Sequence, residues 1–189
     1  MVAIETDRLL IRNFQAGDSE CLRKMIMQWE SSEYAAYDHE WPTSEGEIRR
    51  ITEWFASGDS FVAVCLKDMG GFIGFISLNR TENEESREFN LGYIFDSDYH
   101  SRGYATEGCR AVVDFAFAGL GAQRVITGTA AANYPSCRLL GRLGMVKTGE
   151  SKGSFRKTPD GAPIEFVGWA FALSRDEWSK LGPASRNGS

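Results

Sequence analysis

The chain has 189 residues, of which 42% are hydrophobic and 25% charged, as expected for one α/β domain with a sizeable core. The net charge of −5 argues against nucleic acid as the main partner, and no apolar run approaches the roughly 18 residues of a membrane span. Without a signal-peptide pattern or metal-spaced cysteines, we expect a cytoplasmic protein with reduced thiols.

The N-terminal half predicts a strand, two helices and a β-hairpin. Leucine and isoleucine in Arg8–Phe14 indicate the strand, and Asp18 is expected to cap a helix over Ser19–Trp29. Ser44 and Glu47 form a capping box that opens the second helix. The hairpin is expected from two apolar runs separated by a Gly-Gly turn, Phe61–Leu66 and Phe72–Leu78.

The C-terminal half predicts strands alternating with helices, followed by a β-rich end. The expected strands are Glu88–Phe95, Val125–Ala131, Met145–Gly149 and Ile164–Leu173. The expected helices are a long one that ends at Gly119 or Gly121 and a short one over Pro135–Leu143.

The last part of the chain predicts a small helix and a tail. Ser174 and Glu177 indicate a capped helix that reaches Leu181. Residues 182–189 have no apolar content and are expected to be disordered. We therefore expect residues 1–181 to form a single domain.

The stretch His100-Ser-Arg-Gly-Tyr-Ala-Thr106 joins a strand to a helix through a glycine turn. Backbone N–H groups at a helix start have no acceptors within the helix and lie at the positive end of its dipole, so they can bind a phosphate. Gly103 lets the anion approach closely because it has no side chain. The Lys-Ser/Thr pair of a P-loop and the acidic residue of a dinucleotide fold are both missing. The pattern predicts a phosphorylated cofactor that reacts at its far end.

The loop resembles the acetyl-CoA loop of the GNAT superfamily of N-acetyltransferases, with His100, Gly103 and Ala105 at the three motif positions. His100 replaces the usual Arg or Gln. With Leu91-Gly-Tyr before it, the segment is similar to the ribosomal-protein N-terminal acetyltransferase (RimJ/RimL-like) branch, and the resemblance extends from Glu5 to Trp178. It implies an α/β (α+β) acyl-CoA N-acyltransferase fold, in which helices flank a twisted, mixed, mostly antiparallel sheet that is splayed at the cofactor site.

The resemblance also implies where acetyl-CoA would bind. The backbone of one strand would pair with the pantetheine arm and help polarise the thioester, and the amides of the following loop would bind the diphosphate. Arg102 could pair with a phosphate as well, or remain a solvated loop charge. The expected cofactor-binding residues are Tyr93, Ile94, Phe95, His100, Ser101, Arg102, Gly103, Tyr104, Ala105, Thr106, Asn133 and Ser136.

Asn133-Tyr-Pro-Ser136, followed by Leu143-Gly-Met, resembles a second GNAT motif. From the residues alone, Asn133 could be a helix cap and Ser136 a first-turn residue. Many relatives have a proton-donating Tyr where this chain has Leu140. The resemblance therefore implies that Ser136, or a water it holds, donates to the departing thiolate, and that Asn133 hydrogen-bonds the pantetheine arm or the substrate.

A general base is less easily identified. Asn90 stands where relatives of this branch often have a Glu, and it cannot accept a proton. Glu88 lies two residues earlier on the same strand face, which makes it the carboxylate candidate. The alternatives are that Glu88 is a solvated strand end, or that positioning of a deprotonated amine suffices without a base.

The connection between the first two helices is the expected acceptor pocket. Its aromatic and imidazole side chains are interleaved with acids, which suits a cationic amine. An acidic solvated face with aromatics packed inward is the alternative. The expected substrate-binding residues are Tyr34, Tyr37, His39 and Trp41. His39 and His100 have no neighbouring ligands, so no metal site is expected.

These expectations combine into an acetyl-CoA-dependent N-acetyltransferase that transfers directly in a ternary complex. The preferred acceptor is a protein N-terminal amine. The alternatives are a small amine (an antibiotic, a polyamine or an amino acid) and a non-catalytic acyl-CoA-binding sensor. A late exposed edge strand could pair two copies in a homodimer.

Overall fold

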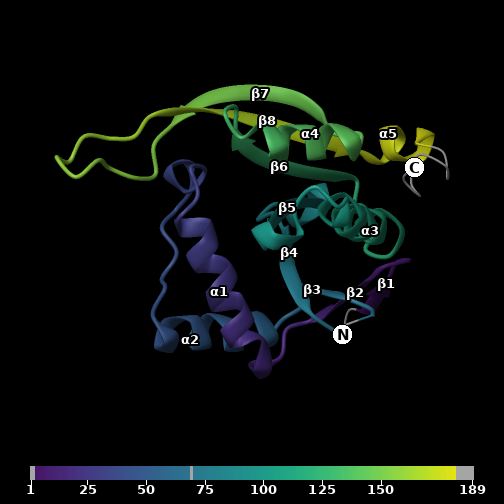
Figure 1. Ribbon diagram of the computed structural model, residues 1–189. Coiled ribbons are helices and arrows are strands. Elements are labelled where there is room, and N and C mark those ends of the chain that lie inside the picture. The colour runs from purple at the N-terminus through teal and green to yellow at the C-terminus, as the bar shows by residue number, and fades with distance from the viewer. Residues whose placement is uncertain (1–2, 69, 182–189) are drawn as a thin grey trace.

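The computed structural model describes residues 3–68 and 70–181. The strands are β1 (Ala3–Glu5), β2 (Leu9–Asn13), β3 (Phe61–Leu66), β4 (Phe72–Arg80), β5 (Glu88–Phe95), β6 (Arg124–Ala130), β7 (Val146–Gly153) and β8 (Phe166–Ser174). In this part of the chain they form one eight-stranded sheet in the order β1-β2-β3-β4-β5-β6-β8-β7 (Figure 1). Neighbouring strands are antiparallel except β5 and β6, which confirms the expected mixed, mostly antiparallel sheet.

The helices cover both faces of the sheet. They are α1 (Ser19–Glu30), α2 (Glu45–Ala56), α3 (Tyr104–Ala118), α4 (Tyr134–Arg142) and α5 (Arg175–Lys180). Helices α1 and α2 lie together on one side of the sheet, and α3 crosses between β5 and β6 on the other (Figure 1). None of the helices within residues 3–68 and 70–181 is long and apolar enough to cross a membrane.

Each face of the sheet has its own hydrophobic core. The core under α1 and α2 contains Phe14, Phe55 and Phe75, whose rings contact one another at centroid distances of 5.0–6.3 Å. The core under α3 and α4 is larger and mostly aliphatic, and includes the fully buried Leu9 and Leu140. Burial of apolar surface contributes about 25 cal/mol per Å². Packing on both faces therefore stabilises the sheet, including the region where two of its strands separate.

The separation occurs between β5 and β6. These strands pair only over Glu88–Asn90 and Arg124–Ile126. Farther along, β5 stays paired with β4 up to Phe95, and β6 stays paired with β8 up to Ala130. Each strand therefore presents one backbone edge to the splay without a strand partner in the described part of the chain.

Three details differ from the sequence-based expectation. β1 was not predicted, because three residues carry too little periodicity. β7 continues to Gly153 rather than Gly149, since its pairing with β8 extends through residues that are polar and exposed. The Asp18 side chain does not cap α1, because its carboxylate binds the Arg12 guanidinium at 2.7 Å and accepts the Gln15 N–H. The expected disordered tail, residues 182–189, lies outside the described residues.

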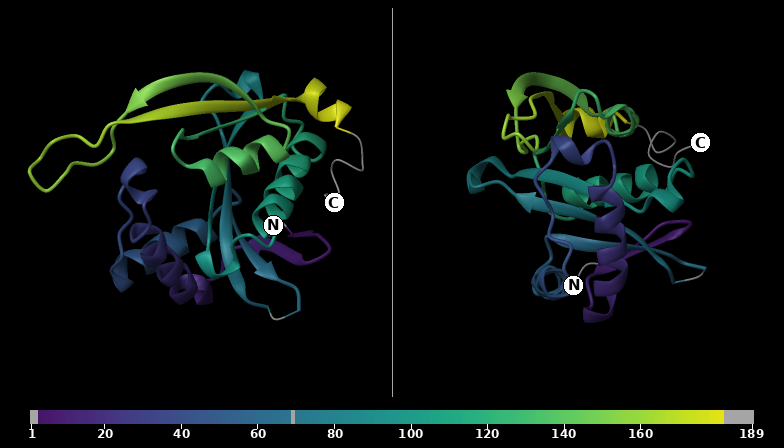
Figure 2. Two further views of the ribbon diagram at one scale, coloured as in Figure 1. Left: turned by 45° about the horizontal axis from the view of Figure 1, so that its top comes forward. Right: turned by 60° about the vertical axis from the view of Figure 1, so that its left-hand side comes forward.

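The other two predicted caps lie at the starts of α2 and α5. Ser174 forms the expected capping box with Glu177 at α5, and Ser44 caps α2 by accepting the N–H of Glu47. The box at α2 is only half formed, because the Glu47 carboxylate binds the Ser44 hydroxyl and not its backbone N–H. The β7–β8 hairpin extends past the body of the sheet toward the end of α1 (Figure 2). That extension brings a late loop next to the α1–α2 connection.

Candidate functional site

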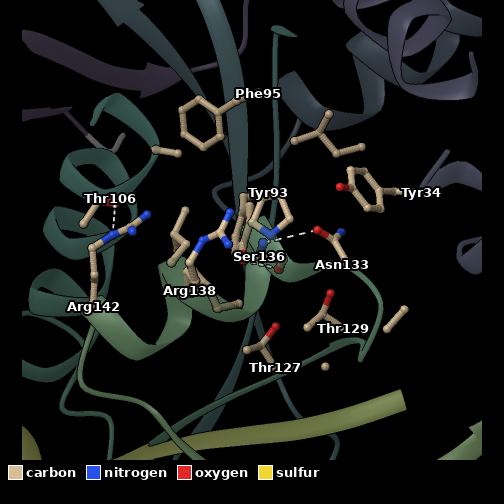
Figure 3. A pocket seen from close by; sticks show the side chains of 18 of the residues that line it. Tyr34, Tyr93, Phe95, Thr106, Thr127, Thr129, Asn133, Ser136, Arg138 and Arg142 are labelled. Atoms are coloured by element: carbon tan, nitrogen blue, oxygen red, sulfur yellow. Dashed lines mark hydrogen bonds between the residues drawn. The ribbon is translucent and has the colours of Figure 1, made fainter. Parts of the chain in front are cut away.

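A cavity of about 2110 Å³ follows the splay between β5 and β6 and continues over the first turns of α3 and α4 (Figure 3). Its volume exceeds the roughly 300–1,000 Å³ of a pocket for one drug-sized ligand. One end is lined by the loop before α3, the middle by β5 and α4, and the other end by the α1–α2 connection and the β7–β8 hairpin. The cavity can therefore hold an extended ligand and a second molecule at its tip.

The first end is built from backbone amides. Ser101 (φ 60°) and Gly103 (φ 82°) both adopt left-handed conformations, which turns the chain sharply into α3. In the described part of the chain, the N–H groups of residues 102–106 donate to no other protein atom, and the first hydrogen bond of the helix runs from the Glu107 N–H to the Gly103 carbonyl. Unpaired amides at a helix start fit a diphosphate.

An ion pair fixes this turn to the N-terminal strands. The Arg8 guanidinium binds the Glu107 carboxylate at 2.6 Å and donates to the Arg102 carbonyl at 3.0 Å. Thr6 also donates to Glu107, at 2.5 Å. Burial raises the pKa of Glu107, but the hydrogen bonds from Thr6 and Arg8 outweigh it and leave that pKa lowered. Glu107 therefore stays ionised and holds the loop.

Three arginines near this end were not predicted: Arg110, Arg138 and Arg142 all line the cavity. Arg142 Nε donates to Thr106 Oγ1 at 3.3 Å, and Arg110 donates to the Arg142 carbonyl at 2.6 Å. The spacing of four residues between Arg138 and Arg142 places both on one face of α4, and Figure 3 shows Arg138 beside Ser136 and Arg142 beside Thr106. This spacing is visible in the sequence and could have indicated a basic helix face. Guanidinium groups at this position are suited to binding phosphate.

Two hydroxyl groups meet in the middle of the cavity. Tyr93 Oη lies 2.6 Å from Ser136 Oγ, and both residues line the cavity. Burial raises the pKa of Tyr93 strongly, so the phenol stays protonated. The Ser136 N–H donates to Asn133 Oδ1 at 3.2 Å, so Asn133 is the helix cap that the residues alone had suggested. This cap holds Ser136 at the start of α4.

The remaining cofactor-binding candidates also line the cavity. Ile94 and Phe95 lie on the stretch of β5 that faces the splay. His100 Nε2 is 2.9 Å from the Phe95 carbonyl, so the imidazole bridges the end of β5 to the loop. The structure thus brings all twelve expected cofactor residues to one cavity.

Glu88 is not brought to the cavity. Its carboxylate lies 3.3 Å from the Arg124 guanidinium, at the end where β5 and β6 are still paired. Asn90, whose amide cannot take a proton, does line the cavity. The wall from Asn90 to Phe95 carries neither a carboxylate nor an imidazole.

The other end of the cavity is aromatic. Tyr34 and Tyr37 line it as expected, together with Phe155 and Phe166 from the β7–β8 hairpin, which were not predicted. His39 and Trp41 do not line it. The His39 ring packs on Phe155 at 4.2 Å, and Trp41 packs into the core beside Phe75.

A second ion pair, between side chains that are only 18% and 14% exposed, closes this end. Arg156 of the hairpin binds both carboxylate oxygens of Glu30 at 2.8 Å and donates to the carbonyls of Asp38 and His39. Burial raises the pKa of Glu30, but hydrogen bonds from Arg156 and from the Trp41 N–H leave it lowered. The pair anchors the hairpin on the α1–α2 connection.

No metal site is evident in the described part of the chain, and three of its four thiols are disfavoured as nucleophiles. It contains no group of three or more His, Cys, Asp or Glu that could hold a metal ion. Burial raises the pKa of the thiols of Cys65, Cys109 and Cys137, which disfavours their nucleophilic thiolates. None of the four cysteines lines the cavity.

Comparison with known proteins points to the same chemistry. Residues 8–146 match the family model described as "Acetyltransferase (GNAT) domain". The chain is 26% identical over 178 residues to the uncharacterized N-acetyltransferase YnaD of Bacillus subtilis, covering 93% of this chain and 99% of YnaD.

Solved structures share the fold at low identity. A GNAT-family acetyltransferase from Bacillus anthracis superposes with a TM-score of 0.79 at 22% identity, covering 93% of this chain and 99% of that one. The ribosomal-protein-S5-alanine acetyltransferase from Vibrio fischeri gives 0.77 at 18% identity, with coverage of 94% and 99%. A spermidine N-acetyltransferase chimera that includes Vibrio cholerae sequence gives 0.71 at 15%, with coverage of 91% and 98%.

Proposed function

Since the chain belongs to the GNAT acetyltransferase family and is an acetyl-CoA-dependent N-acetyltransferase, we propose that its acceptor is the α-amine of a protein N-terminus. Transfer is direct, within a ternary complex of both substrates. The raised pKa of the buried thiols supports direct transfer over an acetyl-cysteine intermediate.

Acetyl-CoA supplies an acetyl group already activated as a thioester. The unpaired amides of residues 102–106 would bind its diphosphate, with Arg138 and Arg142 as further phosphate partners. The free backbone edge of β5 from Tyr93 to Phe95 would pair with the pantetheine arm. These contacts would direct the thioester along β5 toward Ser136.

The chemistry requires one bond to form and one to break. The acceptor nitrogen forms a bond to the carbonyl carbon, the carbon–sulfur bond then breaks, and its electron pair leaves with the sulfur. The nitrogen gives up one proton, which ends on water or on the thiol. Ser136 at the start of α4 would donate a hydrogen bond to the departing sulfur.

The observation that carries the acceptor assignment is the base-free wall of β5 from Asn90 to Phe95. An α-amine with a pKa near 7.8 is neutral in roughly one molecule in seven at pH 7. An aliphatic amine with a pKa near 10.4 is neutral in roughly one in 2,500. A wall without a base beside the proposed thioester position therefore favours an α-amine.

Two further observations support a peptide acceptor. The edge of β6 from Thr127 to Ala130 faces the splay, so an extended chain can pair with it opposite β5. The structurally similar Vibrio fischeri enzyme is named for acetylating a ribosomal-protein alanine. Both fit an N-terminal peptide that lies in the cavity with its amine at the thioester.

A small amine is the second candidate, because the far end of the cavity could hold an ammonium. Tyr34, Tyr37 and Phe155 offer aromatic faces, and Asp38 lines the same end. The spermidine N-acetyltransferase chimera has the same fold. This candidate requires the solvent or Asp38 to remove the proton from the amine.

A thiol-release assay with acetyl-CoA separates these candidates. Two of the acceptors are versions of one peptide: the first has a free α-amine and a blocked lysine, and the second has a blocked α-amine and a free lysine. The other two acceptors are spermidine and an aminoglycoside. We expect kcat/KM at pH 7 to be at least about tenfold higher for the free α-amine than for the others, because of its neutral fraction. A preference for spermidine would overturn the peptide assignment. Tight coenzyme A binding without thiol release on any amine would indicate the non-catalytic sensor.

A further inference from the structure

The hydroxyls of Tyr93 and Ser136 form a pair that joins two distant segments. Tyr93 projects from β5, Ser136 lies in the first turn of α4, and their oxygens are 2.6 Å apart. Both side chains line the cavity between the loop amides and the aromatic end, and Figure 3 shows them together on its wall. The pair therefore lies where a thioester aimed along β5 would place its sulfur.

The direction of the hydrogen bond follows from the surroundings of Tyr93. Burial raises the pKa of the phenol, so it keeps its proton at neutral pH. A phenol is more acidic than an alcohol and is the better donor of the two. Ser136 then accepts from Tyr93 and keeps its own hydrogen for a third atom, because a serine hydroxyl has one donor and two acceptor positions.

We infer that Tyr93 is a positioning residue, whose phenol directs the Ser136 hydroxyl hydrogen at the sulfur that leaves during acetyl transfer. The inference rests on the proposed role of Ser136. A hydroxyl that accepts one hydrogen bond is polarised and becomes a stronger donor in the next. The Asn133 cap fixes the Ser136 backbone, and Tyr93 fixes the rotation of its hydroxyl.

The step balances without proton transfer from the pair. The nitrogen–carbon bond forms, the carbon–sulfur bond breaks, and the sulfur receives the electron pair as negative charge develops on it. The acceptor nitrogen supplies the proton that ends on the thiol or on water. Tyr93 and Ser136 both keep their protons and stabilise the developing thiolate through the hydrogen bond.

The test is a double-mutant cycle with Tyr93→Phe, Ser136→Ala and the double variant. Tyr93→Phe keeps the ring packed against the aliphatic core, and Ser136→Ala keeps the backbone N–H that Asn133 caps. We expect kcat to fall about tenfold in Tyr93→Phe and about 100-fold in Ser136→Ala, with the KM for acetyl-CoA within about twofold of wild type. When Ser136→Ala is already present, adding Tyr93→Phe should lower kcat by less than about a further twofold, because the hydroxyl that Tyr93 orients is gone.

Tyr134→Phe is the matched control. It makes the same change two residues before Ser136, on a side chain that is 65% exposed and does not line the cavity. Its kcat should equal that of wild type. Losses that multiply in the double variant, or a raised KM in Tyr93→Phe with unchanged kcat, would overturn the role of Tyr93 alone. Absence of wild-type thiol release on every amine would overturn the proposed function and this role together.

Discussion

The two ends of the cavity are built from different parts of the chain. The end at α3 is made of backbone amides, shaped by the left-handed turn at Ser101 and Gly103. The far end is made of side chains on two connections, with Tyr34 and Tyr37 before α2 and with Phe155 and Phe166 where β7 ends and β8 begins. Backbone recognition tolerates many sequences, whereas side-chain recognition changes with each substitution. The cavity therefore combines a proposed cofactor end that relies on the backbone with a proposed acceptor end that relies on side chains.

Each end is anchored by one arginine–glutamate pair. Arg8 and Glu107, which are 99 residues apart in the chain, fix the amide turn. Arg156 and Glu30, 126 residues apart, fix the hairpin. The second pair is the more buried, with side chains 18% and 14% exposed against 47% and 19% for the first. Because the anchors are separate, a substitution at one end should change binding at that end and leave binding at the other end unchanged.

Gly103→Val should have the largest effect and should be confined to the cofactor end. A β-branched residue is strained at φ 82°, and its Cβ would lie 3.3 Å from the Arg8 guanidinium. We expect acetyl-CoA to bind about 100-fold more weakly, from about 2–3 kcal/mol of strain and lost amide contacts. Isothermal calorimetry with coenzyme A measures this directly.

Gly46→Val is the control for that substitution. Gly46 lies in the first turn of α2, and an added Cβ there would meet no atom within 4 Å. The affinity of the Gly46→Val variant for coenzyme A should therefore match that of wild type. Equal losses in the two variants would show that the backbone turn at Gly103 is not the cofactor cradle.

Arg8→Met and Arg156→Met compare the two anchors, with smaller expected effects. Without Arg8, the Glu107 carboxylate at the helix start is uncompensated and repels a phosphate, so coenzyme A affinity should fall about tenfold. Without Arg156, the hairpin is released, so the acceptor KM should rise about tenfold while coenzyme A affinity stays constant. Steady-state kinetics with calorimetry on both variants separates the two parameters.

Arg156→Met should also lower the free energy of unfolding by about 1–3 kcal/mol, since it leaves the Glu30 carboxylate largely buried and without its cation. Urea titration measures that loss. If Arg156→Met weakened coenzyme A binding as strongly as Arg8→Met, the two ends would be coupled and the comparison above would be wrong.

The amide turn at the proposed cofactor end was predictable because a local sequence pattern encodes it. A glycine between a strand and a helix specifies both the turn and the unpaired amides, so the local geometry of residues 100–106 followed from the sequence, and their binding of the cofactor stays a prediction. The fold was predictable for a similar reason, since most strands and helices have their own periodicity and caps. β7 was too short in the prediction because its pairing with β8, rather than its own polar residues, determines its length.

The acceptor end was predicted only in part because it depends on long-range contacts. Tyr34 and Tyr37 belong to a segment rich in aromatics, but nothing local indicates that Phe155 and Phe166 join them from the hairpin. Trp41 was assigned to this end and packs instead against Phe75, since an aromatic side chain gains most where it is buried. The pairing of Tyr93 with Ser136 likewise requires β5 and α4 to meet, which only the tertiary structure reveals.

The smallest predicted effect is a pH dependence at the acceptor anchor. Hydrogen bonds from Arg156 and the Trp41 N–H leave the pKa of Glu30 lower in the folded protein than its ordinary value, near 4.3. A carboxyl with a depressed folded pKa stabilises the fold above its unfolded pKa, and that stabilisation is lost as pH falls through the folded pKa. Glu30→Gln should therefore lower the Tm by about 2–4 °C at pH 7, equivalent to about 1 kcal/mol, and the difference from wild type should shrink below about pH 4.

Glu45→Gln serves as the reference for that titration, because Glu45 is 83% exposed and its ion pair with Arg49 is 3.7 Å long. Its Tm should stay within about 1 °C of wild type at every pH, as expected for a surface pair. A Glu30→Gln difference that persisted unchanged at pH 3 would mean that shape rather than charge anchors the hairpin. In that case Arg156→Met should weaken acceptor binding through lost packing, and the acceptor KM of Glu30→Gln should equal that of wild type.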